Sequence, residues 1–329
     1  MRQPQVGRLL PTLAAALVLA APVAAAFRTL VLSIGFLVEF LSDGAVPLLS
    51  DLTPPPLSGA LDPNTDRYRP RGLGGATPLV LVHGLTPDGK DDPRLRRVAA
   101  LLARAGFDVL VPTIPGLTEG RLRPDDARPV VAALAARAEP ARLVSVSVGA
   151  APAFLAAADP SVDGRVSLLL ALGPHASALE LVRFHLTGEY AWGTVRGRAV
   201  RQPALARALI EANAELADPA LRQALASGDA ARVDAAMAAL PEHTRQLFAQ
   251  LSPERSVTAI RAPIVLVHGR ADPAVPYSES LRLAAARPAH TRVVLVGAIA
   301  HVEGATGGLG GLADLVRLLG VVYELLAVG

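Results

Sequence analysis

The stretch that decides the fold is Ala141-Arg-Leu-Val-Ser-Val-Ser-Val-Gly-Ala150. It begins as a short apolar run of strand length and ends in small residues that open an Ala-rich helix. Its centre differs by one residue from the pattern G-x-S-x-G, a tight turn from strand to helix that lifts a serine hydroxyl above the edge of a sheet. The residues two positions either side of that serine must be small, because strand and helix nearly touch there.

Two serines in this stretch compete for the central position. With Ser147 at the centre, the flanking residues are Ser145 and Gly149, and both are small. With Ser145 at the centre, Leu143 would crowd the turn. The pattern therefore favours Ser147, although the window alone also fits an ordinary buried strand that contains two serines.

Two further apolar strands end in residues that could work with Ser147. Ile264-Val-Leu-Val-His-Gly-Arg-Ala-Asp272 ends in an acidic turn, and Thr291-Arg-Val-Val-Leu-Val-Gly-Ala-Ile-Ala-His301 ends in a histidine. Serine, acid and histidine thus follow three predicted strands in the chain order of a known catalytic arrangement. In parallel sheets ligands bind beyond the carboxyl ends of the strands, where all three residues are expected.

These residue types support nucleophilic catalysis. Ser147 needs a base to take its proton, and the imidazole of His301 can accept and return one near neutral pH. Asp272 would hold the correct tautomer of that imidazole. The backbone N–H groups of Leu85 and Val148 are the candidate donors of an oxyanion hole.

The surrounding pattern predicts an α/β fold with a mostly parallel sheet covered by helices on both faces. Short, wholly apolar strands alternate with amphipathic helices from Pro78 onward, and the alternation stops between Gly173 and Pro263. That block predicts a helical cap. We expect cap helices over Ala178–Leu186, Pro203–Leu216, Pro219–Ala226 and Ala230–Leu251, then core helices over Ser278–Ala286 and Leu309–Val328.

The N-terminal region differs in composition. Arg2 and Arg8 precede an uncharged apolar run from Leu9 to Phe27, which is typical of a signal peptide or a membrane anchor. A second apolar run, Thr29 to Val38, is short for a membrane span and predicts a packed or surface-lying helix. The expected organisation is an apolar segment at 1–43, a Pro/Gly-rich linker at 44–76, the core at 77–173, the cap at 174–262 and the rest of the core at 263–329. Within the linker, residues 65–70 could form a short edge strand.

Composition argues against several other classes of protein. The 329 residues carry a net charge of +3 and only 4% aromatic residues, and the arginines are scattered, so no nucleic-acid partner is expected. The absence of cysteine removes disulfides, a thiol nucleophile and thiolate metal sites. The histidines lack H-E-x-x-H spacing, so no metal site is expected, and His83 and His268 are interpreted as structural.

The chain from about Thr77 to Gly329 resembles the α/β-hydrolase superfamily, and in particular its dienelactone-hydrolase-like and carboxylesterase-like bacterial members. The segments that carry the resemblance are Leu81-Val-His-Gly-Leu85, Ser145-Val-Ser-Val-Gly149, His268-Gly-Arg-Ala-Asp272-Pro-Ala-Val-Pro276 and Ala300-His301-Val-Glu. The resemblance implies a carboxylic-ester hydrolase (EC 3.1.1) that works through an acyl-enzyme, with Ser147, Asp272 and His301 as its triad and no cofactor. Ser145 replaces the first glycine of the elbow, and the cysteine nucleophile of dienelactone hydrolases proper is absent.

The sequence leaves alternatives open. A thioesterase, acyltransferase or peptidase could use the same triad, whereas epoxide hydrolases and dehalogenases need a carboxylate at the elbow. A non-catalytic, membrane-associated binding protein could share the fold. We expect a small ester substrate, apolar in character, and a chain that is membrane-anchored or exported to the periplasm or the outside of a bacterial-type cell.

Overall fold

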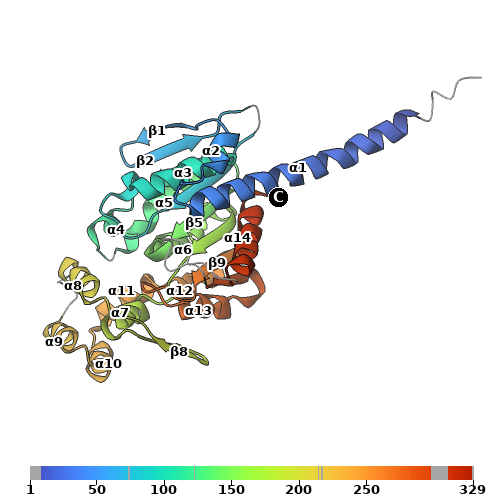
Figure 1. The fold of residues 1–329 in the computed structure, drawn as a ribbon. Helices are drawn as coiled ribbons and strands as arrows, with labels where there is room; N and C mark the ends of the chain where they lie inside the picture. Colours follow the sequence, from blue (N-terminus) through green and yellow to red (C-terminus); the bar gives the residue numbers. More distant parts are fainter. Residues whose placement is uncertain are drawn as a thin grey trace, which may run out of the picture.

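One large sheet organises the molecule (Figure 1). The computed structural model describes residues 9–72, 75–121, 123–213, 215, 218–297 and 310–327. Eight strands pair in the order β1-β2-β4-β3-β5-β6-β9-β10. Their bounds are β1 Leu57–Asp62, β2 Thr65–Arg69, β3 Thr77–Val82, β4 Phe107–Pro112, β5 Ala141–Val146, β6 Val166–Leu172, β9 Ile264–Gly269 and β10 Thr291–Val296.

Six strands of this sheet pair in parallel, namely β3, β4, β5, β6, β9 and β10, whereas β1 and β2 join it antiparallel. Every residue of β4 and β9 is buried. Such uniform burial is expected of parallel strands that are covered on both sides, because neither face of the strand meets water. The predicted fold class is therefore confirmed.

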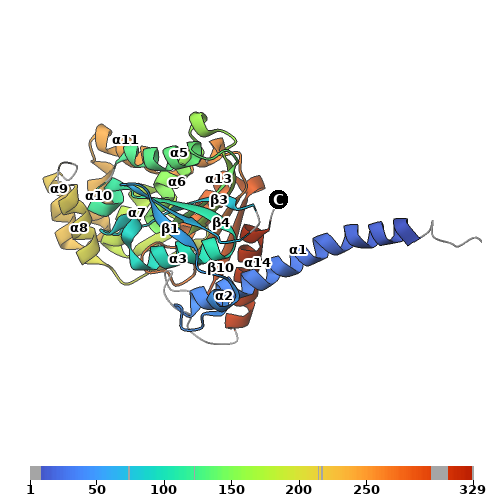
Figure 2. The same ribbon diagram turned by 90° about the horizontal axis from the view of Figure 1, so that it is seen from above.

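Helices cover the two faces of the sheet as separate layers (Figure 2). One hydrophobic cluster joins the sheet to α1 (Leu9–Leu41), α3 (Pro93–Arg104) and α14 (Gly310–Leu326). A second cluster joins the other face to α5 (Ala127–Ala135), α6 (Ala150–Ala157) and α13 (Ser278–Ala286). Asp92 caps the N-terminus of α3: its carboxylate accepts the N–H groups of Arg94 and Leu95 at 2.9 and 3.2 Å.

The N-terminal helix has two different halves. The second apolar run continues the first as part of one 33-residue helix, and its Phe36 and Leu37 are packed into the core. Glu39 fixes the helix end by accepting the Ser50 N–H and hydroxyl at 2.8 and 2.5 Å. Val23 and Phe27 in the other half are instead 68% and 67% exposed. Part of the segment 1–43 therefore belongs to the folded core.

Within the described part of the chain, one helix is long and apolar enough to cross a membrane. Its 20-residue stretch Pro22–Leu41 has a mean hydropathy of 1.8. A signal sequence or a core helix fits the same description, so composition supports export or anchoring only weakly.

The region 44–76 is not the linker that its composition predicts. It contains α2 (Leu48–Leu52) and the strands β1 and β2. Tyr68 of β2 is buried, and Arg67 reaches the Asp108 carboxylate of the neighbouring strand β4 at 2.9 and 2.6 Å. The prolines stand just outside the ends of these elements, so they mark turns.

The block between β6 and β9, where a helical cap is expected, lies at one end of the molecule in both views (Figures 1 and 2). Its elements are α7 Ala178–Thr187, β7 Glu189–Trp192, β8 Val195–Arg198, α8 Pro203–Ala212, α9 Pro219–Ser227, α10 Ala230–Ala238 and α11 Glu242–Gln250. The antiparallel hairpin β7–β8 was not predicted. It is too short to show strand periodicity in the sequence.

Candidate active site

Ser147 occupies the turn between β5 and α6. Its φ is +54°, a left-handed conformation that non-glycine residues rarely adopt. Such strain persists only where the surrounding structure enforces it, and it concentrates at functional sites. Ser147 is half-buried at this turn, while Ser145 is fully buried inside the strand. The local backbone therefore has the form of a nucleophile elbow centred on Ser147.

Two glycines allow the turn to pack closely. A Cβ at Gly149 would lie 2.2 Å from the His83 carbonyl oxygen, a separation that no side chain can tolerate. A Cβ at Gly84 would lie 3.2 Å from the Val146 oxygen and 3.4 Å from the Ser147 Cβ. The loop after β3 therefore runs directly against the elbow, as an oxyanion loop must.

His83 holds this loop in one orientation. The Ile114 N–H donates to His83 Nε2 at 2.9 Å, so Nε2 carries no proton and Nδ1–H donates to the Gly84 oxygen at 2.7 Å. Burial lowers the pKa of His83, which keeps this neutral tautomer. Because the two ends of a peptide unit point in opposite directions, fixing the Gly84 C=O also fixes the Leu85 N–H.

The Leu85 N–H has no acceptor in the described residues, and the Leu85 side chain is 40% exposed. The Val148 N–H lies at the start of the short helix Ser147–Gly149. Both predicted donors thus lie on segments that adjoin Ser147, where they could face a developing oxyanion.

Asp272 lies in a tight turn three residues beyond β9. Its Oδ1 accepts the N–H groups of Ala274 and Val275 at 2.8 and 3.0 Å. Its Oδ2 lies 3.6 Å from His268 Nε2, and a Cβ on Gly173 would come within 3.2 Å of it. The carboxylate is therefore oriented by its own turn and is almost wholly removed from water.

His268 has structural partners, as predicted. Its Nδ1 lies 2.7 Å from the Ser280 hydroxyl, and its Nε2 lies 2.9 Å from the Val275 oxygen. The ring thereby ties the end of β9 to α13 and to the Asp272 turn.

His301 lies outside the described residues. The strand that precedes it, β10, pairs in parallel with β9, and its end is fixed where the Gly297 N–H donates to Asp314 Oδ2 at 2.6 Å. Ser147 follows β5 and Asp272 follows β9, and only β6 separates these two strands. Their axes are therefore about 10 Å apart, and the chain leaves β10 beside β9.

The cap packs directly over the elbow. Leu181 and Phe184 of α7 form a buried apolar cluster with Val275 from the Asp272 turn. Val148, the neighbour of Ser147, packs against this cluster, and so does Tyr190 of the hairpin. Val148, next to Ser147, and Val275, three residues after Asp272, therefore pack against the same apolar side chains of the cap.

Polar contacts also bind the cap to the core. Glu279 of α13 accepts the N–H groups of Ala176 and Ser177, where the chain passes from the core into the cap, each at 2.9 Å. Burial raises the pKa of Glu279. Gln202 donates to the Pro273 oxygen at 3.1 Å, next to Asp272. Isolated polar residues such as Glu279 and Gln202 follow no sequence pattern that marks them as contacts between cap and core, so the sequence does not predict these contacts.

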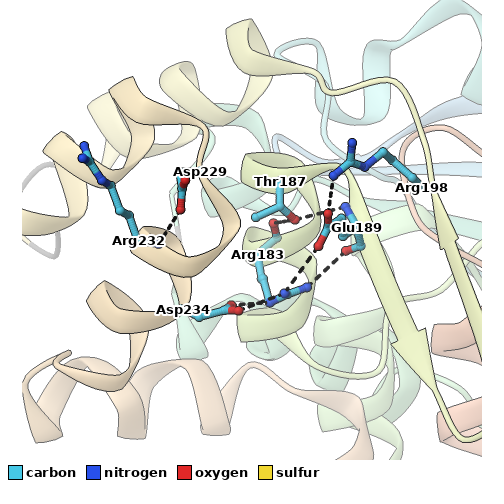
Figure 3. A network of polar contacts seen from close by, with 7 residues as sticks. All are labelled: Arg183, Thr187, Glu189, Arg198, Asp229, Arg232 and Asp234. Atoms are coloured by element: carbon cyan, nitrogen blue, oxygen red, sulfur yellow. Dashed lines mark hydrogen bonds and ion pairs between the residues drawn. The ribbon is translucent and has the colours of Figure 1, made fainter.

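A charged network stiffens the cap itself (Figure 3). Arg183 Nη2 lies 3.1 Å from Asp234 Oδ2 and 4.0 Å from Glu189 Oε2, and Arg198 also pairs with Glu189. Arg183 lowers the pKa of Asp234. Thr187 adds hydrogen bonds to the Arg183 oxygen and from the Glu189 N–H, at 2.9 and 3.0 Å. The network joins α7 to the hairpin and to α10.

Among the described residues no cluster of histidine, aspartate and glutamate could hold a metal ion. The described residues near the elbow are Ser147 with a positive φ, the buried carboxylate of Asp272 two strands away, and the loop after β3 that packs against the elbow.

Several solved structures are similar to this chain at low sequence identity. A 2,6-dihydroxy-pseudo-oxynicotine hydrolase is 19% identical with a TM-score of 0.51, over 88% of this chain and 72% of that one. A truncated carbohydrate esterase from gut microbiota is 13% identical with a TM-score of 0.49, over 83% and 95%. The acylaminoacyl peptidase of Pyrococcus horikoshii is 13% identical with a TM-score of 0.49, and the match covers 82% of this chain but only 40% of that one.

No curated protein matches the sequence. A family model described as "alpha/beta hydrolase fold" matches residues 77–302, which include the elbow, the Asp272 turn and His301. The chain therefore belongs to the α/β-hydrolase fold family.

Proposed function

We propose that the protein is a serine hydrolase that cleaves a carboxylic ester through an acyl-enzyme on Ser147. The observation that carries this proposal is the positive φ of Ser147, at a turn whose close packing requires glycine at position 149. A buried strand with an incidental serine has no reason to maintain that strain.

The proposed reaction has two halves. His301 takes the Ser147 proton while the oxygen attacks the ester carbonyl, and the Leu85 and Val148 N–H groups bind the oxyanion. His301 then protonates the leaving alcohol as the acyl-enzyme forms. Water, deprotonated by His301, releases the acid and regenerates Ser147. Asp272 orients the imidazole and stabilises its charged form.

Thioesters, amides and acyl transfer would use the same steps, because they differ only in the leaving group or in the acceptor. The cap selects among such substrates in this proposal. Leu181 and Phe184 of the cap form an apolar cluster with Val275 of the core, which supports a small ester with an apolar part. The chain would act at a membrane or after export, with α1 as its anchor or leader.

The test is turnover of a panel of aryl esters with acyl chains of increasing length, by the wild type and by Ser147→Ala. We expect wild-type turnover and a loss of about 10³-fold or more in the variant. Ser161→Ala is the matched control, because Ser161 is exposed and bonded only to Asp159 in its own turn. Equal, near-zero turnover by wild type and Ser147→Ala would favour a non-catalytic binding protein.

A further inference from the structure

The outer face of α14 is apolar where a surface helix should be polar. Leu312, Leu315 and Val316 are 68%, 42% and 62% exposed. Their spacing of three and four residues places them on one face of the helix. Leu318 and Val322 pack into the core on the other side. The exposed face therefore needs a partner that is not water.

The helix α14 lies beside the helix that can enter a membrane. The core half of α1 packs against α14, since Phe36 and Leu37 share a cluster with Leu318 and Val322. Figures 1 and 2 both show α14 on the side of the body from which the N-terminal half of α1 (residues 9–27, the free half) projects. In both views the cap helices α8 to α10 lie at the opposite end.

The free half of α1 has the length of a bilayer core. The run Leu9–Phe27 carries no charge and extends about 28 Å at the rise of an α-helix. Arg28 follows at the point where the helix reaches the folded body. Leu30 and Ile34 are still 38% and 39% exposed, which extends the apolar surface of α1 toward the body.

We propose that the outer face of α14, formed by Leu312, Leu315 and Val316, lies in the interface of a lipid bilayer that the free half of α1 spans. The two helices together fix the orientation of the body. The cap then faces away from the bilayer. If Ser147 acts as proposed above, its ester substrate therefore comes from the aqueous phase and not from the lipid leaflet.

A second copy of the chain fits this face less well than lipid does. Three side chains on one helix offer much less than the roughly 800 Å² per partner that a stable protein interface buries. A helix that presents apolar residues outward beside a membrane anchor matches the behaviour of interfacial helices. Exposed arginines such as Arg317 can extend to the lipid headgroups.

The chain contains no cysteine, so a single introduced cysteine can carry an environment-sensitive fluorophore. The probe sites are Leu312→Cys and Val316→Cys on α14 and Val23→Cys on α1. The matched controls are Ala132→Cys on α5 and Ala204→Cys on α8, both exposed helical positions. Each full-length variant is reconstituted into phosphatidylcholine and phosphatidylglycerol vesicles, with or without lipids that carry a spin-label quencher near the headgroup.

We expect the probes at positions 312 and 316 to be quenched several-fold more strongly than those at 132 and 204. The probe at position 23 should be quenched most by a label on the upper part of the acyl chain, because it lies four residues, about 6 Å along the helix, inside the end of the run Leu9–Phe27. Quenching at 312 and 316 no stronger than at 132 would overturn the docking of α14. Strong quenching at 204 would overturn the orientation, and a probe lost from position 23 by cleavage, or not quenched there, would overturn the span.

This readout uses no enzymatic turnover. Ester hydrolysis by the Ala132→Cys variant, measured on the same vesicles, reports the proposed function separately. A failure of membrane docking and a failure of catalysis are therefore distinguishable.

Discussion

The elbow and the cap are stabilised in different ways. Around Ser147 the backbone is fixed by steric contact, with Gly149 against the His83 carbonyl and no room for another residue. The cap has a small apolar core of its own and charged pairs such as Arg183–Asp234, in which the aspartate is half exposed. Exposed ion pairs contribute little stability. The backbone geometry at Ser147 is therefore fixed by the sheet and its adjoining loop, whereas the cap is held by a small core of its own and by contacts with the Asp272 turn.

The largest expected effect follows from Asp272→Asn. The amide would keep the shape of the side chain but favour the wrong tautomer of His301, and kcat should fall by about 10⁴-fold with little change in KM. Steady-state kinetics on an aryl ester measures it. Asp163→Asn, an exposed aspartate paired with Arg261, is the control and should retain activity. A fall in kcat of less than tenfold would show that Asp272 does not orient the catalytic histidine.

Gly149→Ala tests whether sterics fix the elbow. The new Cβ would collide with the His83 oxygen, so the turn must shift, at a cost of about 1–3 kcal/mol of stability. A displacement of about 1 Å at the nucleophile should lower kcat by about 10²-fold. Urea unfolding and kinetics measure the two effects.

Gly59→Ala is the matched control, because a Cβ at Gly59 meets nothing within 4 Å. If Gly149→Ala were as active and as stable as this control, the steric account of the elbow would be wrong.

The smallest effect at neutral pH is expected on the cap side, from His175→Gln. Burial lowers the pKa of His175 to about 4 from 6.5, and its Nε2 lies 3.4 Å from the Leu251 oxygen. The folded state holds the neutral ring, so its stabilising contribution is present above about pH 6.5 and is lost as the pH falls toward 4. The difference between a pKa of 6.5 and a pKa of about 4 corresponds to about 3 kcal/mol in the free energy of unfolding.

Glutamine can still donate to Leu251 but does not titrate. Urea unfolding of His175→Gln at pH 7 and at pH 4.5 should therefore show a smaller loss of stability on acidification than the wild type. The same loss in both proteins would show that His175 does not contribute to acid sensitivity.

The sequence predicts the sheet and its helices well, because parallel strands that are buried on both faces have continuous apolar runs. It predicts the elbow at Ser147 because the local pattern and the small flanking residues act over a few positions. It does not predict β1, because the six exposed residues of that strand have no apolar pattern. The possible edge strand at 65–70 does form β2, but it pairs with both β1 and β4, so it does not lie at the edge of the sheet. The contact of Glu279 with Ala176 and Ser177 joins residues about a hundred positions apart, so no local pattern predicts it. The predicted site residue His301 lies outside the described residues.

The central claim is that Ser147 is the nucleophile. The most direct measurement is reaction of the full-length protein with a fluorophosphonate probe, followed by mass spectrometry of the labelled peptide. We predict one adduct, on Ser147, that is absent from Ser147→Ala. No adduct on the wild type, or an adduct on another serine that persists in Ser147→Ala, would contradict the account.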